Sequence, residues 1–184
     1  VPRLHPVLFV HRVAGLTPGV YALPRHPQAE RAMRERLRGD FEWQTPDHVP
    51  AHLPLFRLLA ADCRRVAKTA SCHQAIAGDS CFSLAMLGEF EPIIRTNARR
   101  YRQLHWEAGL LGQVLYLEAE AAGLRGTGIG CYFDDEVHAM LGIEGREFQV
   151  LYQFTVGRPL TDDRIITSPA YPGRERNEQT AGAT

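Results

Sequence analysis

The chain has 184 residues, of which 45% are hydrophobic and 23% are charged, a balance typical of one globular domain with a sizeable core. The formal net charge of zero favours neither a nucleic-acid partner nor an anionic membrane surface. No apolar run approaches the roughly 20 residues of a membrane span, and no signal-peptide pattern opens the chain, so we expect a cytoplasmic protein.

The first half of the chain predicts a hairpin followed by alternating helices and strands. β-Branched and aromatic residues indicate strands at 7–13, 20–23 and 55–59, and the turn between the first two predicts a β-hairpin. Helices are predicted at 28–38, ending at Gly39, and at 61–75, broken by Gly78-Asp79. The run 81–90 fits a buried strand or a helix by length, and we favour a strand because a turn precedes it.

The longest apolar pattern predicts a central helix that begins near Tyr101 and is capped by Gly123. Two adjacent apolar stripes recur at helical spacing, which is more than a one-sided surface helix needs, so we expect this helix to be mostly buried. Gly109 and Gly112 lie on one side of the helix and predict a close approach by another helix.

The glycine-rich segment Gly126–Gly130 follows this helix and predicts a turn. Phosphate-binding glycine loops have the reverse order, in which a strand precedes the glycines and a helix follows them. Two interpretations remain open. The segment is either a tight helix-to-strand turn, or it brings backbone N–H groups close to a planar ligand.

The last third predicts a short helix from Asp134 to Gly142 and a strand over 147–157. In that strand Phe148, Val150, Tyr152, Phe154 and Val156 are expected to face one side. Residues 173–184 are polar and are predicted to be a disordered tail. The whole order predicts one α+β domain over residues 1–172.

Motifs for hydrolytic or metal chemistry are missing from the sequence. The eight histidines include no HExxH pair, and there is no GxSxG elbow, so we expect no metal site. The four cysteines have no CxxC spacing, and we expect all of them to be free thiols: Cys63, Cys72, Cys81 and Cys131.

Several runs resemble the nitroreductase superfamily, and within it the SagB-type dehydrogenases. The resemblance rests on HWEAGLLGQVLYLEAEAAGLRGTGIGCYFDDEVHAMLG, on the later LYQFTVGRP, and on the turn Gly15–Tyr21. It extends from about Leu4 to Pro172. It implies a nitroreductase-like α+β three-layer sandwich with a mainly antiparallel sheet, and a homodimer or a second nitroreductase-like domain that completes the site.

The resemblance also implies an FMN cofactor and hydride transfer through flavin N5. Backbone around Gly128, Ile129 and Gly130 would lie near the flavin ring. Arg3, Leu4 and His5 match the end of a family segment that borders the flavin.

Two departures from the family pattern affect the implied function. The arginine and serine motif that holds the FMN phosphate would precede Val1, so we expect part of the family domain to lie upstream. Members that oxidise azolines are similar in carrying a Lys-Tyr pair shortly before the long helix. In this sequence Arg95 and Thr96 stand at the corresponding positions. Arginine is a poor general base, and Tyr101 is the substitute candidate as proton donor.

Three functional hypotheses follow. The first is an FMN-dependent dehydrogenase acting on a peptide or small molecule, with Arg95 and Tyr101 as the catalytic candidates. The second is a cofactor-free partner or dimerisation domain that keeps only the fold. The third is an NAD(P)H nitroreductase acting on small aromatic compounds.

Overall fold

The computed structural model describes residues 1–166, 168 and 171, and the predicted tail at 173–184 lies outside them. One sheet contains six strands: β1 (Leu4–Val10), β2 (Gly19–Ala22), β3 (Phe56–Ala60), β4 (Phe82–Glu89), β5 (Arg125–Ile129) and β6 (Phe148–Gly157). The helices are α1 (Pro27–Arg36), α2 (Arg64–Ala70), α3 (Ala75–Asp79), α4 (Glu91–Thr96), α5 (Tyr101–Ala121) and α6 (Asp134–Leu141). A single 3-10 turn, η1 (Ala98–Arg100), joins α4 to α5.

The strands lie in the order β3-β2-β1-β4-β6-β5, and each neighbouring pair is antiparallel. The predicted hairpin of β1 and β2 is confirmed. The choice of a strand for 81–90 is also confirmed, because β4 pairs with β1 on one side and with β6 on the other.

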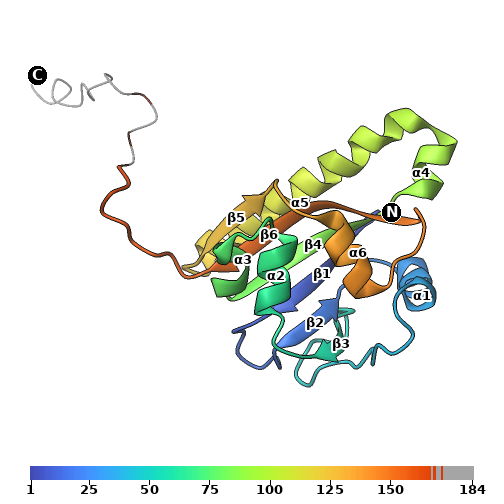
Figure 1. The fold of residues 1–184 in the computed structure, drawn as a ribbon, viewed down its shortest axis with the longest axis horizontal. Coiled ribbons are helices and arrows are strands. Elements are labelled where there is room, and N and C mark those ends of the chain that lie inside the picture. The colour runs from blue at the N-terminus through green and yellow to red at the C-terminus, as the bar shows by residue number, and fades with distance from the viewer. Residues whose placement is uncertain (167, 169–170, 172–184) are drawn as a thin grey trace, which may run out of the picture.

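Helices cover both faces of this sheet and make three layers (Figure 1). On one face α1, α2, α3 and α6 bury residues such as Met33, Ala70 and Val137 against the sheet. On the other face α5 buries Leu104, Ala108 and Ala119. The predicted α+β three-layer architecture is therefore confirmed. No helix within the described ranges combines the length and the apolar content that crossing a membrane demands.

The helix predicted at 61–75 is two short helices instead. Cys72 and His73, with φ of 52° and 59°, adopt the left-handed conformation that ends α2 and turns the chain into α3. The predicted stop at Gly78-Asp79 is wrong, because both residues lie inside α3. The left-handed pair is unusual, since residues with a Cβ rarely adopt positive φ.

The predicted glycine turn is also wrong, because residues 125–129 form the edge strand β5 and pair with β6. The predicted faces of the last strand need correction as well. A bulge between Val150 and Tyr152 adds one residue, Leu151, opposite the step from Met86 to Leu87. Phe148 and Val150 therefore lie in one core, whereas Tyr152 and Phe154 lie beneath α5.

The expectation that α5 is buried on both apolar stripes is wrong. Leu104, Ala108, Gly112 and Ala119 are buried, but the outward side of the helix is exposed. The exposed stripe consists of Trp106, Leu110, Val114 and Leu117, with exposed fractions of 62%, 65%, 47% and 60%. Polar residues normally occupy that side of a surface helix, so this stripe is an unpartnered apolar face.

The prediction of four free thiols is wrong for two of them. Cys72 and Cys131 form a disulfide across 59 residues of chain, with their Cα atoms 5.8 Å apart. Cys63 and Cys81 are free. The sequence carried no CxxC signal because the two bonded cysteines meet only when the turn after α2 packs against the segment that follows β5.

Candidate functional site

One carboxylate ties the start of β1 to α5. Glu107 accepts hydrogen bonds from the backbone N–H of Arg3, at 3.0 Å from both carboxylate oxygens, and from the N–H of Leu4 at 3.2 Å. The guanidinium of Arg25 donates to the same carboxylate at 2.6 Å. Charge-assisted bonds of this kind are about twice as strong as neutral ones, so Glu107 fixes the segment Arg3–His5 relative to α5.

A second carboxylate, Glu89 at the end of β4, accepts bonds from two histidines and an arginine. The Nε2 atoms of His5 and His26 lie 3.3 Å and 2.9 Å from its Oε1, and Arg3 donates to its Oε2. The Nδ1 atoms of both rings accept backbone N–H groups, from Arg25 and from Ala29. The protons are therefore on Nε2, and the cluster is a hydrogen-bonded network rather than a set of free metal ligands.

Burial would raise the pKa of the Glu89 carboxyl, but the hydrogen bonds from His5 and Arg3 outweigh burial and lower the pKa to about 2. The folded state therefore binds this proton more weakly than the unfolded state does. Stability from this group is complete above the ordinary pKa of 4.5 and is lost as the pH falls towards 2.

We expect Glu89→Gln to remove this dependence of the free energy of unfolding on pH. The wild-type chain should exceed the variant in free energy of unfolding by about 2 kcal/mol at neutral pH, after allowance for partial exposure of the carboxylate. That difference should shrink as the pH falls below 4.5. Urea unfolding of both proteins at several pH values measures it. A difference that stays constant down to acid pH would contradict the assignment.

Two glycines of β5 make room for aromatic rings. A Cβ on Gly126 would lie 2.7 Å from the ring of Phe154, and a Cβ on Gly128 would overlap the hydroxyl of Tyr152. The N–H of Gly128 also donates to the hydroxyl of Tyr116 on α5 at 2.8 Å. Packing therefore accounts for Gly126 and Gly128. Gly130, beyond the strand, is exposed and has no atom within 4 Å of its would-be Cβ.

Gly128→Ala is expected to lower the free energy of unfolding by about 2 kcal/mol, because the added methyl group must displace the Tyr152 ring from the layer beneath α5. Gly130→Ala is the matched control and should change stability by less than about 0.5 kcal/mol. Urea unfolding compares the two variants. Equal midpoints would show that β5 adjusts to a side chain at position 128.

The two predicted catalytic residues lie on the chain that leads into α5. Arg95 is exposed in the last turn of α4, and Tyr101 begins α5 with 45% of its surface exposed. Tyr101 meets the rings of Phe90 and His105 edge-on. Burial, then Asp134, then Tyr101 raise the pKa of Tyr132 to about 12.

The predicted cofactor residues fall into two groups that one chain does not bring together. Arg3, Leu4 and His5 begin β1, whereas Gly128, Ile129 and Gly130 end β5. Strands β4 and β6 stand between the two groups. Three strand spacings of about 4.8 Å separate them by roughly 14 Å across the sheet. Leu4 and His5 are fully buried, so of the first group Arg3 alone reaches solvent.

Sequence reasoning missed Glu89, Glu107 and His26, the residues that hold the first group in place. Glu107 had a detectable signal, because it is one of three Asp, Glu, Lys or Arg residues in the apolar stretch from Leu104 to Leu124. His26 caps α1 by accepting the N–H of Ala29, a role for which Ser, Thr, Asp and Asn are the usual residues. Its partner Glu89 lies 63 residues away.

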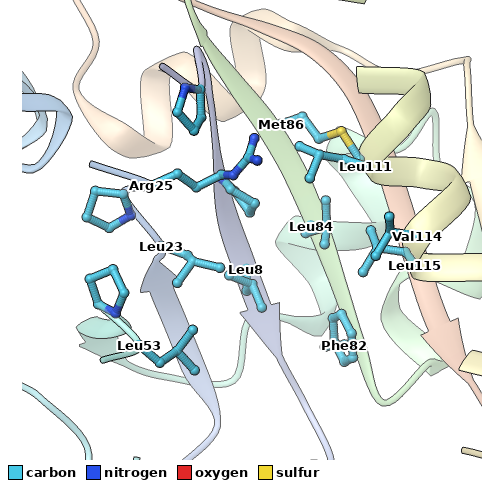
Figure 2. Close-up of a pocket in the computed structure, with 14 residues that line it drawn as sticks. Leu8, Leu23, Arg25, Leu53, Phe82, Leu84, Met86, Leu111, Val114 and Leu115 are labelled. Atoms are coloured by element: carbon cyan, nitrogen blue, oxygen red, sulfur yellow. The ribbon is translucent and has the colours of Figure 1, made fainter. Parts of the chain in front are cut away.

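An apolar cavity of about 490 Å³ opens between the sheet and α5. Figure 2 shows Leu8, Leu84 and Met86 of the sheet pointing into the same space as Leu111 and Leu115 of α5. Arg25 is the charged residue in its wall, and that guanidinium is already paired with Glu107. The cavity borders Val114 of the exposed α5 stripe, so the two apolar surfaces are continuous.

Three solved structures resemble this one. A chain described as a nitroreductase from Anabaena variabilis is 26% identical with a TM-score of 0.65, and the match covers 86% of this chain and 27% of that chain. The E. coli microcin synthetase McbBCD complex, with truncated pro-MccB17 bound, gives 18% identity, TM-score 0.59 and coverage of 87% and 53%. A chain described as a nitroreductase from Ralstonia eutropha is 14% identical with a TM-score of 0.57, and the match covers 88% of this chain and 60% of that chain.

The present chain thus spans less than two thirds of each of these relatives. No curated protein sequence matches it. The model of the nitroreductase family, in contrast, matches residues 26–158, which runs from the cap of α1 to the end of β6 and includes well over half of the chain. Together with the three-layer fold and the long helix over the sheet, this match shows that the chain belongs to the nitroreductase family.

Proposed function

We propose that this chain is an FMN-dependent oxidoreductase subunit of the SagB-type branch of the superfamily. The observation that carries the proposal is the open space beside Gly130, where no atom lies within 4 Å of the would-be Cβ. The exposed ring of Phe133 follows in the chain and meets His73 edge-on at 5.7 Å. A planar ring system could therefore approach the backbone at Gly130 without meeting a side chain.

In this proposal the backbone of Ile129 and Gly130 lies beside the flavin, and Gly128 keeps its packing role. Arg95 supplies a fixed positive charge, and the hydroxyl of Tyr101 can donate a proton. Arg3 and the buried pair Leu4 and His5 form the second part of the site, held by Glu107 and Glu89. FMN itself, when bound, supplies hydride chemistry, and the substrate is a peptide or another small molecule.

The test is the visible absorption spectrum of the purified protein with and without added FMN, together with equilibrium dialysis. A yellow protein that releases about one flavin per subunit on denaturation is the expected result. Gly130→Leu should weaken FMN binding by about tenfold or more, because its side chain fills the open space, whereas Gly39→Leu after α1 is a control outside that space and outside the stripe on α5. Equal FMN affinity in both variants would overturn the assignment of Gly130.

A cofactor-free partner domain is the second candidate, and a specific observation favours it. The cationic side chains beside the first group are already neutralised, Arg3 by Glu89 and Arg25 by Glu107. Neither is left unpaired to hold a phosphate. A chain lengthened at its N-terminus by a segment with the family's arginine and serine motif decides between the two. If that longer chain also takes up no FMN but still self-associates, the partner-domain interpretation stands.

A second nitroreductase-like domain is the partner that we propose, either a second copy of the chain or a fused repeat. The exposed stripe Trp106–Leu117 and the adjoining cavity give an apolar surface that one chain leaves uncovered. Roughly 14 Å separate the two groups of candidate cofactor residues, so residues from a second domain are needed to complete one site. An isologous dimer provides each site with both groups.

A further inference from the structure

The disulfide Cys72–Cys131 joins two segments that otherwise touch through few bonds. It links the turn between α2 and α3 to the segment that follows β5. Beside it, the N–H of Phe133 donates to the carbonyl of Ala70 at 2.7 Å, and the amide of Gln74 donates to the carbonyl of Cys131 at 3.0 Å. The disulfide adds a covalent bond to these two hydrogen bonds, to the ring pair of His73 and Phe133, and to the packing of Tyr132 against the core.

The two bonded cysteines differ in exposure. Cys131 is an exposed residue, whereas Cys72 is only partly exposed. Of the two free cysteines, Cys63 is a weak candidate for thiol exchange. It is buried, and burial raises the pKa of its thiol to about 11, which suppresses its thiolate. We therefore expect an incoming thiolate to reach Cys131 more readily than Cys72.

The turn that carries Cys72 is held in an unfavourable backbone conformation. Cys72 and His73 both have positive φ, and a left-handed conformation is unfavourable for a residue with a Cβ. The disulfide holds Cys72 of this turn to Cys131. Removing the crosslink therefore leaves a turn whose own preference opposes the contact with residues 131–133.

We propose that Cys72–Cys131 is a reversible thiol–disulfide exchange site for small thiols of the glutathione class, and that it latches the segment after β5 to the turn after α2. A thiolate attacks the Cys131 sulfur, the bond between the two cysteines breaks, and Cys72 leaves as a thiolate that takes up a proton. A second thiolate then attacks the sulfur of the small thiol, which releases the oxidised disulfide of that thiol and a free Cys131. Two small thiols are oxidised and one protein disulfide is reduced.

The exchange does not depend on the proposed cofactor. Gly130 immediately precedes Cys131, so a change in FMN binding on reduction would rest in addition on the proposed function. For the cytoplasmic protein that we propose, a permanent disulfide would be uncommon and a reversible one is the usual kind.

The test is a titration of the wild-type chain in buffers of reduced and oxidised glutathione, followed by acid quenching, maleimide labelling and peptide mass mapping. Cys72 and Cys131 are expected to gain label together as the share of reduced glutathione rises, whereas Cys63 stays unlabelled and Cys81 labels equally throughout. Two results would overturn the proposal. Labelling of Cys72 and Cys131 in fully oxidised buffer would mean that no disulfide forms. Absence of labelling at both cysteines until the protein is denatured would mean that the crosslink is permanent.

Two further measurements test the site of attack and the latch. Cys72→Ser should accumulate a glutathione mixed disulfide on Cys131 under oxidised glutathione, and Cys131→Ser should form much less on Cys72; the reverse order contradicts the assigned attack. Cys81→Ser is the matched control. Amide hydrogen exchange of residues 70–74 and 130–134 should accelerate by about tenfold on reduction of the wild-type chain. Unchanged exchange would overturn the latch even where the titration succeeds, and neither readout requires FMN.

Discussion

Leu110→Asp is expected to dissociate the proposed dimer into monomers. Leu110 is 65% exposed at the middle of the stripe Trp106–Leu117 on α5, so it would lie at the centre of a helix-mediated interface. A carboxylate there would be desolvated without a partner, which costs several kcal/mol. In a two-fold dimer the substitution occurs twice, so the dimer dissociation constant should rise by at least about 100-fold.

Sedimentation equilibrium over a range of protein concentrations measures this constant. The matched control is Leu59→Asp on β3, where the same substitution is made at an exposed leucine outside the stripe. Its circular dichroism spectrum and dissociation constant should remain those of the wild type. A wild-type chain that stays monomeric at all concentrations would contradict a homodimer and leave a fused second domain as the partner.

The second large effect is expected for Glu107→Ala, which should lower the free energy of unfolding by about 3 kcal/mol. The substitution leaves the guanidinium of Arg25 and the N–H groups of Arg3 and Leu4 without their acceptor. Partly buried donors that lose a charged acceptor incur most of their desolvation cost. For a chain of this length the midpoint of thermal unfolding should fall by roughly 6–12 °C.

Calorimetry or thermal circular dichroism measures the change, and Glu118→Ala, at an exposed position on the same helix, is the control for loss of a glutamate. Glu107→Gln should recover part of the stability, since an amide oxygen can accept the backbone N–H groups but carries no charge for Arg25. Equal stability of Glu107→Ala and Glu118→Ala would show that the start of β1 does not depend on this carboxylate.

The local sequence pattern was enough to predict those helices and strands that are determined by their own residues. The hairpin of β1 and β2, the strand β4 and the long α5 followed from periodicity and turn chemistry, and Gly123 takes the predicted left-handed cap with φ of 70°. The prediction that alternate residues of β6 face one side was wrong after Val150. The cause is a bulge, which depends on pairing with β4 and not on the sequence of β6 alone.

The candidate site depended on contacts between distant residues, and these were the least predictable. Gly126 and Gly128 suggested a turn, but the cause of both glycines lies in Phe154, Tyr152 and Tyr116, which pack against β5 from other elements. Cys72 and Cys131 are unremarkable in sequence and meet only in the folded chain. Glu107 stood out as an isolated charge in an apolar helix, yet its partners lie more than 80 residues away in sequence.

The hydroxyl of Tyr116 over β5 has a consequence for aggregation. β5 is one outer strand of the sheet, and Tyr116 occupies the N–H that Gly128 turns outwards. At the opposite border, Gln44 bridges to Arg57 of β3. Exposed strand borders are templates on which further strands add, as in domain swapping and fibril growth. With backbone groups bonded at each border, the sheet offers fewer unpaired groups to a strand of another chain, which favours the α5 stripe as the surface for the proposed association.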